Sequence, residues 1–190
     1  MRKALVTFAV ASVLFLVSPA FAQGPYLGAG FMYNFPVGSD IKYLDSGPGL
    51  EFTFGYNFGS VALEGNLMGS WHDDSDPAYG HADFGGVSID LKVFLLPLVQ
   101  PNQAYILAGF GSYWLYEYDP YLYTDTELDG YGWNVGAGFE HYLSHNMGLN
   151  AEVIYRFIRY DQIDAGGFVY SINNQNGDMV TVKAGVVFYW

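Results

Sequence analysis

Two groups of residues in this sequence have the types that nucleophilic catalysis requires. His141, Ser144 and Glu152 lie near one another in the chain, and the segment HDDSD at 72–76 also contains a histidine, a serine and acids. A serine becomes a nucleophile when a histidine removes its proton and an acid orients that histidine. In the segment at 72–76 the histidine is too close in sequence to the serine for an arranged strand geometry. Neither group establishes a catalytic site on its own.

The same acidic segment offers ligands for a divalent cation. Asp73, Asp74 and Asp76 are followed by His81 and Asp83. Hard cations such as Mg²⁺ and Ca²⁺ prefer clustered carboxylate oxygens, although the spacing here differs from that of an EF-hand loop. An acidic stretch is equally typical of a solvated loop. The three aspartates at 73, 74 and 76 are therefore candidate metal ligands beside that alternative, and no cofactor is expected.

In the sequence segments that would position these residues, apolar and polar residues alternate with a period of two. In GLEFTFGYNF the apolar residues from Leu50 to Phe58 fall on one face, and Glu51, Thr53 and Asn57 fall on the other. Such alternation predicts a strand with one apolar face. The pattern recurs along the chain and predicts eight strands, near 25–34, 50–58, 61–71, 87–95, 104–116, 133–140, 149–158 and 181–190.

The connections between these strands alternate in length. Short turns are expected at Gly59-Ser60, Pro97–Asn102 and Ser144–Met147, and long loops near 35–48, 72–82, 117–130 and 161–177. Short turns at one end and long loops at the other are typical of an outer-membrane barrel. We therefore predict an all-β fold, an eight-stranded antiparallel transmembrane up-and-down β-barrel. The alternative is a soluble barrel that keeps its apolar face inward around a ligand.

The first 22 residues are expected to be removed from the mature protein. A short basic start, an apolar run and the small residues before Gln23 have the layout of a secretory signal peptide. The apolar run is shorter than the roughly 20 residues that a membrane helix needs. The division is thus a signal peptide at 1–22 and one barrel domain at 23–190, located in the bacterial outer membrane.

The composition excludes several other classes of protein. The chain has no cysteine, so no disulfide framework holds the exported domain. Arg2 and Lys3 lie in the predicted leader, which leaves five basic residues against all 19 acidic residues. A polyanion of this kind is a poor ligand for nucleic acid. The hydrophobic content of 51% excludes an acidic disordered chain.

Charged residues recur on the face of the strands that should point into the barrel. An eight-stranded barrel is just wide enough for side chains to fill, and a charge inside it needs a partner. We expect five acids and three bases to form a luminal charge network. Its members are Glu51, Glu64, Asp90, Lys92, Glu140, Glu152, Arg156 and Lys183.

A resemblance to a known family rests on the strand segments LGAGF, LAGFG, VGAGF and KAGVVF and on the closing aromatic residue. The chain resembles the small outer-membrane β-barrels such as the transmembrane domain of outer membrane protein A and outer membrane protein X. That resemblance implies a luminal salt-bridge gate on strands two, four, six and seven. By strand and facing, the matching residues are Glu51, Lys92, Glu140 and Arg156.

The resemblance also implies how the chain reaches its membrane. The final alternation, with Val186, Phe188 and Trp190 facing lipid, resembles the signal that the barrel-assembly machinery reads in this family. Some small barrels modify lipid A with a serine, a histidine and an acid at the outer rim. Here Ser144 is expected in a periplasmic turn and His141 faces lipid near it, so we predict that the chain is not an enzyme.

Aromatic and acidic residues fill the expected external region. Tyr113, Trp114, Tyr116, Tyr131 and Trp133 are predicted to form the outer aromatic girdle, whereas Tyr118, Tyr121 and Tyr123 could equally bind a surface ligand.

We expect a plugged or narrow barrel with a structural or surface-interaction role through long acidic, tyrosine-rich loops. Its partners would be lipopolysaccharide, the barrel-assembly machinery and a surface ligand, and the chain would be a monomer. The alternative function is a small-solute or cation-leaning pore gated by the luminal salt bridges.

Overall fold

The computed structural model describes residues 23–73, 80–95, 101–119, 124–165 and 167–190. Within these residues there are nine antiparallel strands and no helix that is long and apolar enough to cross a membrane. The strands are β1 (Gly24–Pro36), β2 (Gly47–Asn57), β3 (Val61–Asp73), β4 (His81–Phe94), β5 (Asn102–Asp119), β6 (Thr124–Tyr142), β7 (Met147–Ala165), β8 (Phe168–Asn176) and β9 (Met179–Tyr189).

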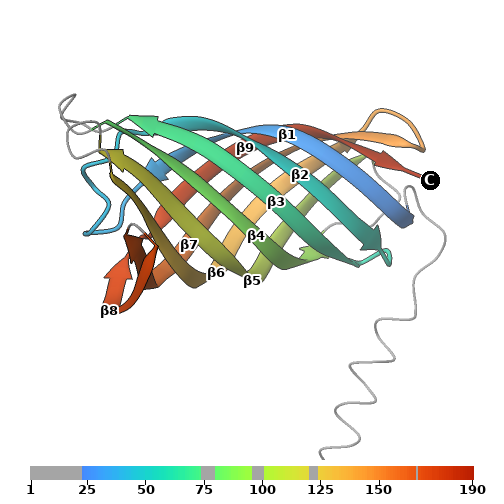
Figure 1. The fold of residues 1–190 in the computed structure, drawn as a ribbon. Coiled ribbons are helices and arrows are strands. Elements are labelled where there is room, and N and C mark those ends of the chain that lie inside the picture. The colour runs from blue at the N-terminus through green and yellow to red at the C-terminus, as the bar shows by residue number, and fades with distance from the viewer. Residues whose placement is uncertain (1–22, 74–79, 96–100, 120–123, 166) are drawn as a thin grey trace, which may run out of the picture.

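Eight of these strands form a closed wall. Each of β1 to β6 pairs with the next strand in the chain, and β9 joins β7 to β1 (Figure 1). Closure places Tyr26 opposite Tyr189 and Met147 opposite Phe188. The predicted eight-stranded antiparallel up-and-down barrel is confirmed. The ninth strand, β8, forms a hairpin with the end of β7 outside the closed wall.

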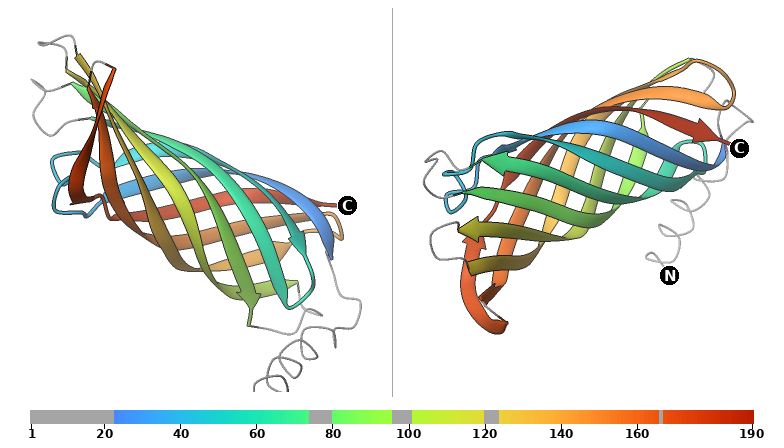
Figure 2. Two further views of the ribbon diagram at one scale, coloured as in Figure 1. Left: turned by 60° about the horizontal axis from the view of Figure 1, so that its bottom comes forward. Right: turned by 45° about the horizontal axis from the view of Figure 1, so that its top comes forward.

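The two ends of the barrel differ, as the connection lengths predict. At one end, which we call the turn end, Phe58 N donates to Val61 O and Leu143 N donates to Met147 O across tight turns. At the other end, which we call the hairpin end, β5 and β6 and then β7 and β8 extend beyond the rest of the wall (Figure 2).

The predicted loops near 117–130 and 161–177 are wrong in their secondary structure. β5 runs to Asp119, β6 begins at Thr124, β7 runs to Ala165, and β8 occupies 168–176. Together the two segments are rich in acidic, amide and glycine residues, which are typical of loops, so the sequence alone did not mark them as strands. Backbone hydrogen bonds between neighbouring strands continue without an apolar–polar alternation.

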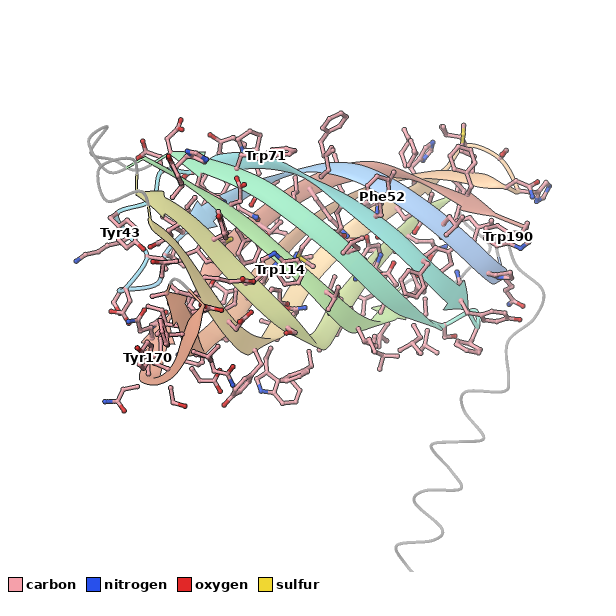
Figure 3. The ribbon with its side chains drawn as sticks, in the orientation of Figure 1. Tyr43, Phe52, Trp71, Trp114, Tyr170 and Trp190 are labelled. Atoms are coloured by element: carbon pink, nitrogen blue, oxygen red, sulfur yellow. The ribbon has the colours of Figure 1, made fainter. Side chains whose placement is uncertain are left out.

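Large apolar side chains cover the outside of the wall. Phe52, Ile89 and Trp133 are each more than half exposed, as a lipid-facing surface requires. Trp71 and Trp190 lie toward opposite ends of the barrel, where aromatic girdles meet the two interfaces (Figure 3). The outward face of the strands is therefore the lipid face.

One member of the predicted girdle is misplaced. Tyr113 is fully buried, stacks on Phe84 with ring centroids 5.8 Å apart, and donates a hydrogen bond of 2.6 Å to Asn134 Oδ1. Alternation from Phe110, which faces outward, places residue 113 inside and residue 114 outside. Trp114 does lie on the outer face, with its indole over Gly85, where any Cβ atom would clash with the ring.

Candidate functional site: the barrel lumen

All eight residues of the predicted luminal charge network have side chains buried inside the wall. Their exposed fractions are between 0% and 5%. They come from β2, β3, β4, β6, β7 and β9, so ionic contacts among them link strands that are not neighbours in the wall. Which acid meets which base depends on the stagger of the strands.

Two lysines organise the middle of the lumen. Lys92 Nζ lies 2.7 Å from Glu64 Oε1 and 2.8 Å from Glu152 Oε1. Lys183 Nζ lies 2.9 Å from Glu152 Oε2 and also pairs with Glu51. Glu152 therefore shares its two carboxylate oxygens between two buried ammonium groups.

Arg156 extends the chain of ion pairs toward the hairpin end. Its Nη2 lies 3.4 Å from Glu51 Oε2, and its Nε donates to Thr181 Oγ1 at 3.2 Å. Three acids and three bases thus alternate in one connected series across the lumen. Each buried charge in the series has an opposite charge beside it, which is the condition for tolerating ions in such a place.

Asp90 is held by neutral donors. Asn134 Nδ2 donates to its Oδ1 at 2.9 Å, and Asn66 Nδ2 and Ser88 Oγ donate to its Oδ2 at 2.8 and 3.0 Å. Three hydrogen bonds to one carboxylate distribute its charge without a salt bridge within 4.0 Å among the described residues.

Glu140 lies apart from the ionic series, near the turn end. Tyr189 OH donates to its Oε1 at 2.5 Å, and no cation of the described chain lies within salt-bridge distance. The four residues that the family resemblance suggests for a gate therefore do not form one connected set of ion pairs among themselves. Glu51 does contact Arg156, but Lys92 contacts Glu64 and Glu152 in place of Glu140.

Neutral side chains continue the polar series to the hairpin end. Thr181 Oγ1 donates to Asn34 Oδ1 at 2.6 Å, and Asn34 Nδ2 donates to Ser70 Oγ at 2.8 Å. Ser70 Oγ lies 2.8 Å from His72 Nε2, and His72 Nδ1 lies 2.8 Å from the carbonyl oxygen of Asp45. With Nδ1–H donating to that carbonyl, Nε2 accepts a hydrogen bond from Ser70 Oγ, so the series runs in one direction from Thr181 to Asn34 and from Ser70 to Asp45.

An apolar layer fills the lumen above the charges, and sequence reasoning missed it. Met32, Met68, Phe84, Leu115 and Met179 belong to one buried cluster at the hairpin end. The sequence did indicate where they lie, because alternation along the strands places Met68 and Phe84 on the inward face. The sequence predicted a charge network on that face, and its apolar members were not predicted to form a layer of their own.

The first long loop, residues 37–46, closes this layer. Ile41 and Leu44 are buried in the apolar cluster. The backbone of the loop is fixed, because Gly38 N donates to Asp178 O at 2.8 Å and Asp45 N donates to Asp73 O at 2.8 Å. The segment therefore covers the lumen at the hairpin end.

Aromatic side chains fill the opposite end of the lumen. Tyr26, Tyr105, Tyr142 and Tyr189 lie in a second buried cluster together with Phe94. Tyr26 OH donates to Glu64 Oε1 at 2.8 Å, and Tyr105 OH donates to Glu152 Oε1 at 2.7 Å. The phenols therefore close the turn end and also hydrogen-bond the ionic series.

The structure does not assemble the catalytic group around residue 141. His141 lies on the outer side of the wall and its Nδ1 contacts Asn102 at 2.7 Å, whereas Glu152 binds the two lysines inside. Ser144 is exposed in the turn after β6. Ser70 is the serine that contacts His72, and both are buried in the lumen.

The remaining predicted sites fall partly outside the described residues. The structure does not describe the predicted signal peptide at 1–22, nor Asp74, Ser75, Asp76, Tyr121 and Tyr123. Among the described residues, no group of three or more potential ligands is arranged to hold a metal ion. Tyr118 packs its ring against His81, with centroids 5.6 Å apart.

Comparison with known proteins gives a consistent result. A family profile described as outer membrane protein beta-barrel domain matches residues 8–188. No curated protein matches the sequence. The solved structures that resemble the chain include neisserial surface protein A, with 15% identity, a TM-score of 0.67 and coverage of 89% of this chain and 99% of that one.

Two further neighbours have the same architecture. OprG, an outer membrane protein of Pseudomonas aeruginosa, has 16% identity and a TM-score of 0.67, covering 90% of this chain and 98% of that one. Ail, the attachment invasion locus protein of Yersinia pestis, was solved with the heparin analogue sucrose octasulfate. It has 14% identity and a TM-score of 0.58, covering 88% and 99% of the two chains. At these identities the likeness concerns the fold alone.

Proposed function

Because this chain belongs to the outer membrane protein β-barrel domain family and is a bacterial outer-membrane protein, we propose that it acts as a plugged barrel that presents its extracellular hairpins to a surface ligand. The hairpin end is then extracellular and the turn end periplasmic. The role is structural and interactive, and we propose no enzymatic step.

One observation supports the proposal that the lumen is plugged. Three packed layers follow one another along it: the apolar cluster under residues 37–46, the ionic series around Glu152, and the tyrosine cluster near Tyr189. An aqueous channel would hydrate the charged side chains, but Arg156 has no exposed surface and Glu152 has only 2%. The alternative pore would require these layers to separate.

Charge supports a cationic surface ligand. Fourteen of the 19 acidic residues lie outside the luminal charge network, and in the described hairpins only Lys42 and Arg159 oppose them. Ail was solved with a polyanion, and the acidic hairpins of this chain would repel such a ligand. Lipopolysaccharide would surround the barrel, with divalent cations bridging its anionic groups to the acids.

Conductance measurements test the plug. In planar bilayers the protein should show no unitary conductance, and Lys92→Ala and Arg156→Ala should show none either, because the apolar and tyrosine layers remain. Arg159→Ala, at the extracellular rim, is the control for loss of a positive charge. A clear unitary conductance that rises in Lys92→Ala or Arg156→Ala would contradict the plugged barrel and support the gated pore.

Surface binding can be measured separately from conductance. Protein in nanodiscs of zwitterionic lipid should bind a polylysine-coated surface and not a heparin-coated one. Binding should fall when residues 161–176 are replaced by a short glycine–serine turn, and it should weaken at about 1 M salt, where the Debye length is about 3 Å. Equal binding to both coatings, or no effect of the replacement, would contradict a cationic ligand.

A further inference from the structure

The β7–β8 hairpin leaves the first part of one strand edge without a strand partner, whereas Asn176 at the end of β8 exchanges hydrogen bonds with Asp40 of the loop at 37–46. Among the described strands, β8 pairs with β7 alone, and its other edge continues no sheet. Phe168, Val169 and Tyr170 are 67%, 64% and 56% exposed. Figure 3 shows Tyr170 on this hairpin, at the extracellular end and away from the wall. Exposed backbone of this kind can pair with another extended chain.

The first part of this edge lacks the usual protection against pairing. Natural edge strands are blunted by lysine, by proline, by very short length, by bulges or by a covering loop, and in β8 the register shift and the loop contact both come after Ser171. β8 has the sequence FVYSINNQN over nine residues, with no charged residue and no proline. Its first five residues combine aromatic and β-branched types, which favour extended structure.

Strand register shows that one face of the hairpin is apolar. Leu128 on β6 is opposite Ile163 on β7, which is opposite Tyr170 on β8. Residues opposite each other across strands lie on the same face, and alternation adds Phe168 and Ile172 to it. Ile163 and Ile172 pack against the apolar cluster of the lumen. This face therefore continues the apolar layer into the extracellular region.

The other face is acidic. Glu127, Asp164 and Val169 form one row across β6, β7 and β8. Asp129, Gln162 and Ser171 form the next row. Two spacings of about 4.8 Å separate Asp164 from a strand added beyond β8, a distance of about 10 Å that a lysine or arginine side chain can shorten.

We propose that β8 binds an extended segment of a partner protein in which apolar and basic residues alternate. The backbone of the segment pairs with the free part of the edge, its apolar side chains cover Phe168 and Tyr170, and its basic side chains lie on the same face as Asp164. This proposal rests on the surface-interaction role and specifies the chemistry of the partner.

A second copy of the chain fits this edge less well. Two β8 strands pairing together would bring two acidic faces into one sheet, and neither strand carries a basic residue. Like charges on one face of a sheet are destabilising. The segment that best complements this edge therefore comes from a different protein.

Peptide binding to the full chain in zwitterionic nanodiscs tests the proposal. A fluorescent nine-residue peptide of alternating valine and lysine should raise its anisotropy on binding. The same peptide with N-methyl groups on alternate valines keeps its charge but loses backbone donors, so its dissociation constant should rise by at least about tenfold. A valine–glutamate peptide should not bind.

Variants of the hairpin locate the site. Phe168→Ser with Tyr170→Ser should weaken binding by about tenfold or more, since two apolar side chains lose their cover. Val37→Ser, at an exposed apolar position on the loop at 37–46, should leave binding unchanged. Heat-modified gel mobility reports whether each variant retains the folded barrel.

Three results would overturn strand addition at β8. They are equal binding of the N-methylated peptide, unchanged binding by the double serine variant, and disulfide-linked dimers of Val169→Cys that exclude the peptide. If the peptide fails to bind but replacement of 161–176 still abolishes binding to polylysine, strand addition fails and the surface role stands. If the peptide binds while that replacement has no effect on the polylysine assay, the surface role fails.

Discussion

Replacing Glu152 by glutamine should lower the free energy of unfolding by about 3 kcal/mol. The substitution preserves shape but removes the charge that lies 2.8 Å from Lys92 and 2.9 Å from Lys183. Each lysine retains one other carboxylate, Glu64 or Glu51, so the cost falls at the lower end of the range for breaking a buried ion pair.

Urea unfolding in lipid vesicles measures this loss. Glu140→Gln is a matched control, because Glu140 is equally buried but hydrogen-bonds Tyr189 and has no salt bridge among the described residues. Its cost should be about 1 kcal/mol. Adding Lys183→Met to Glu152→Gln should cost less than the sum of the two single changes, because the two residues are in contact. Equal losses for Glu152→Gln and Glu140→Gln would show that the ionic series contributes little to stability.

Deleting residues 188–190 should leave the protein in the periplasm. Phe188 pairs with Leu27 on one side and with Met147 on the other, so its strand closes the wall at the periplasmic end. The deletion also removes the Tyr189 hydroxyl from Glu140 and the bond from Trp190 N to Pro25 O. We expect at least about a tenfold fall in heat-modifiable protein in the outer-membrane fraction, because the last strand can no longer complete its pairing with β1 and β7.

A second variant separates recognition of the aromatic side chains by the assembly machinery from backbone pairing of β9. Phe188→Ala with Trp190→Ala keeps the backbone of β9 but removes two aromatic side chains from the lipid face. If the assembly machinery reads those aromatics, this variant should also accumulate in the periplasm. Trp133→Ala, a lipid-facing aromatic on β6, is the control for a general loss of lipid contact. Normal insertion of the deletion variant would refute the assembly role of these residues.

Alternation of residue types was sufficient to predict the wall and the inward facing of its charges. A strand has only two faces, so once Phe52 faces lipid, Glu51 must face the lumen. The same rule places Lys183 inside, between Val182 and Ala184. The pairing of Lys92 with Glu64 and Glu152 was not predictable, because it depends on strand stagger, which is fixed when the barrel closes.

The filling of the lumen and the hairpin extensions were not predicted for a different reason. Burial inside a narrow barrel suits apolar and charged side chains alike, so Met68 and Phe84 carry no signal that marks them as a separate layer. The segment at 161–177 contains three glycines and three asparagines, so it resembles a loop in sequence. Tyr113 was misassigned because aromatic type was given more weight than strand parity.

Closure of the wall has a consequence for the timing of folding. Tyr26 meets Tyr189, and the residues that meet Glu152 come from β4 and β9, which are distant in the sequence. Contacts between distant segments form slowly, because a long loop must close before they stabilise anything. A barrel still open between β1 and β9 would expose unpaired ammonium and carboxylate groups to lipid. Insertion and neutralisation of the interior should therefore occur together, in a single cooperative step.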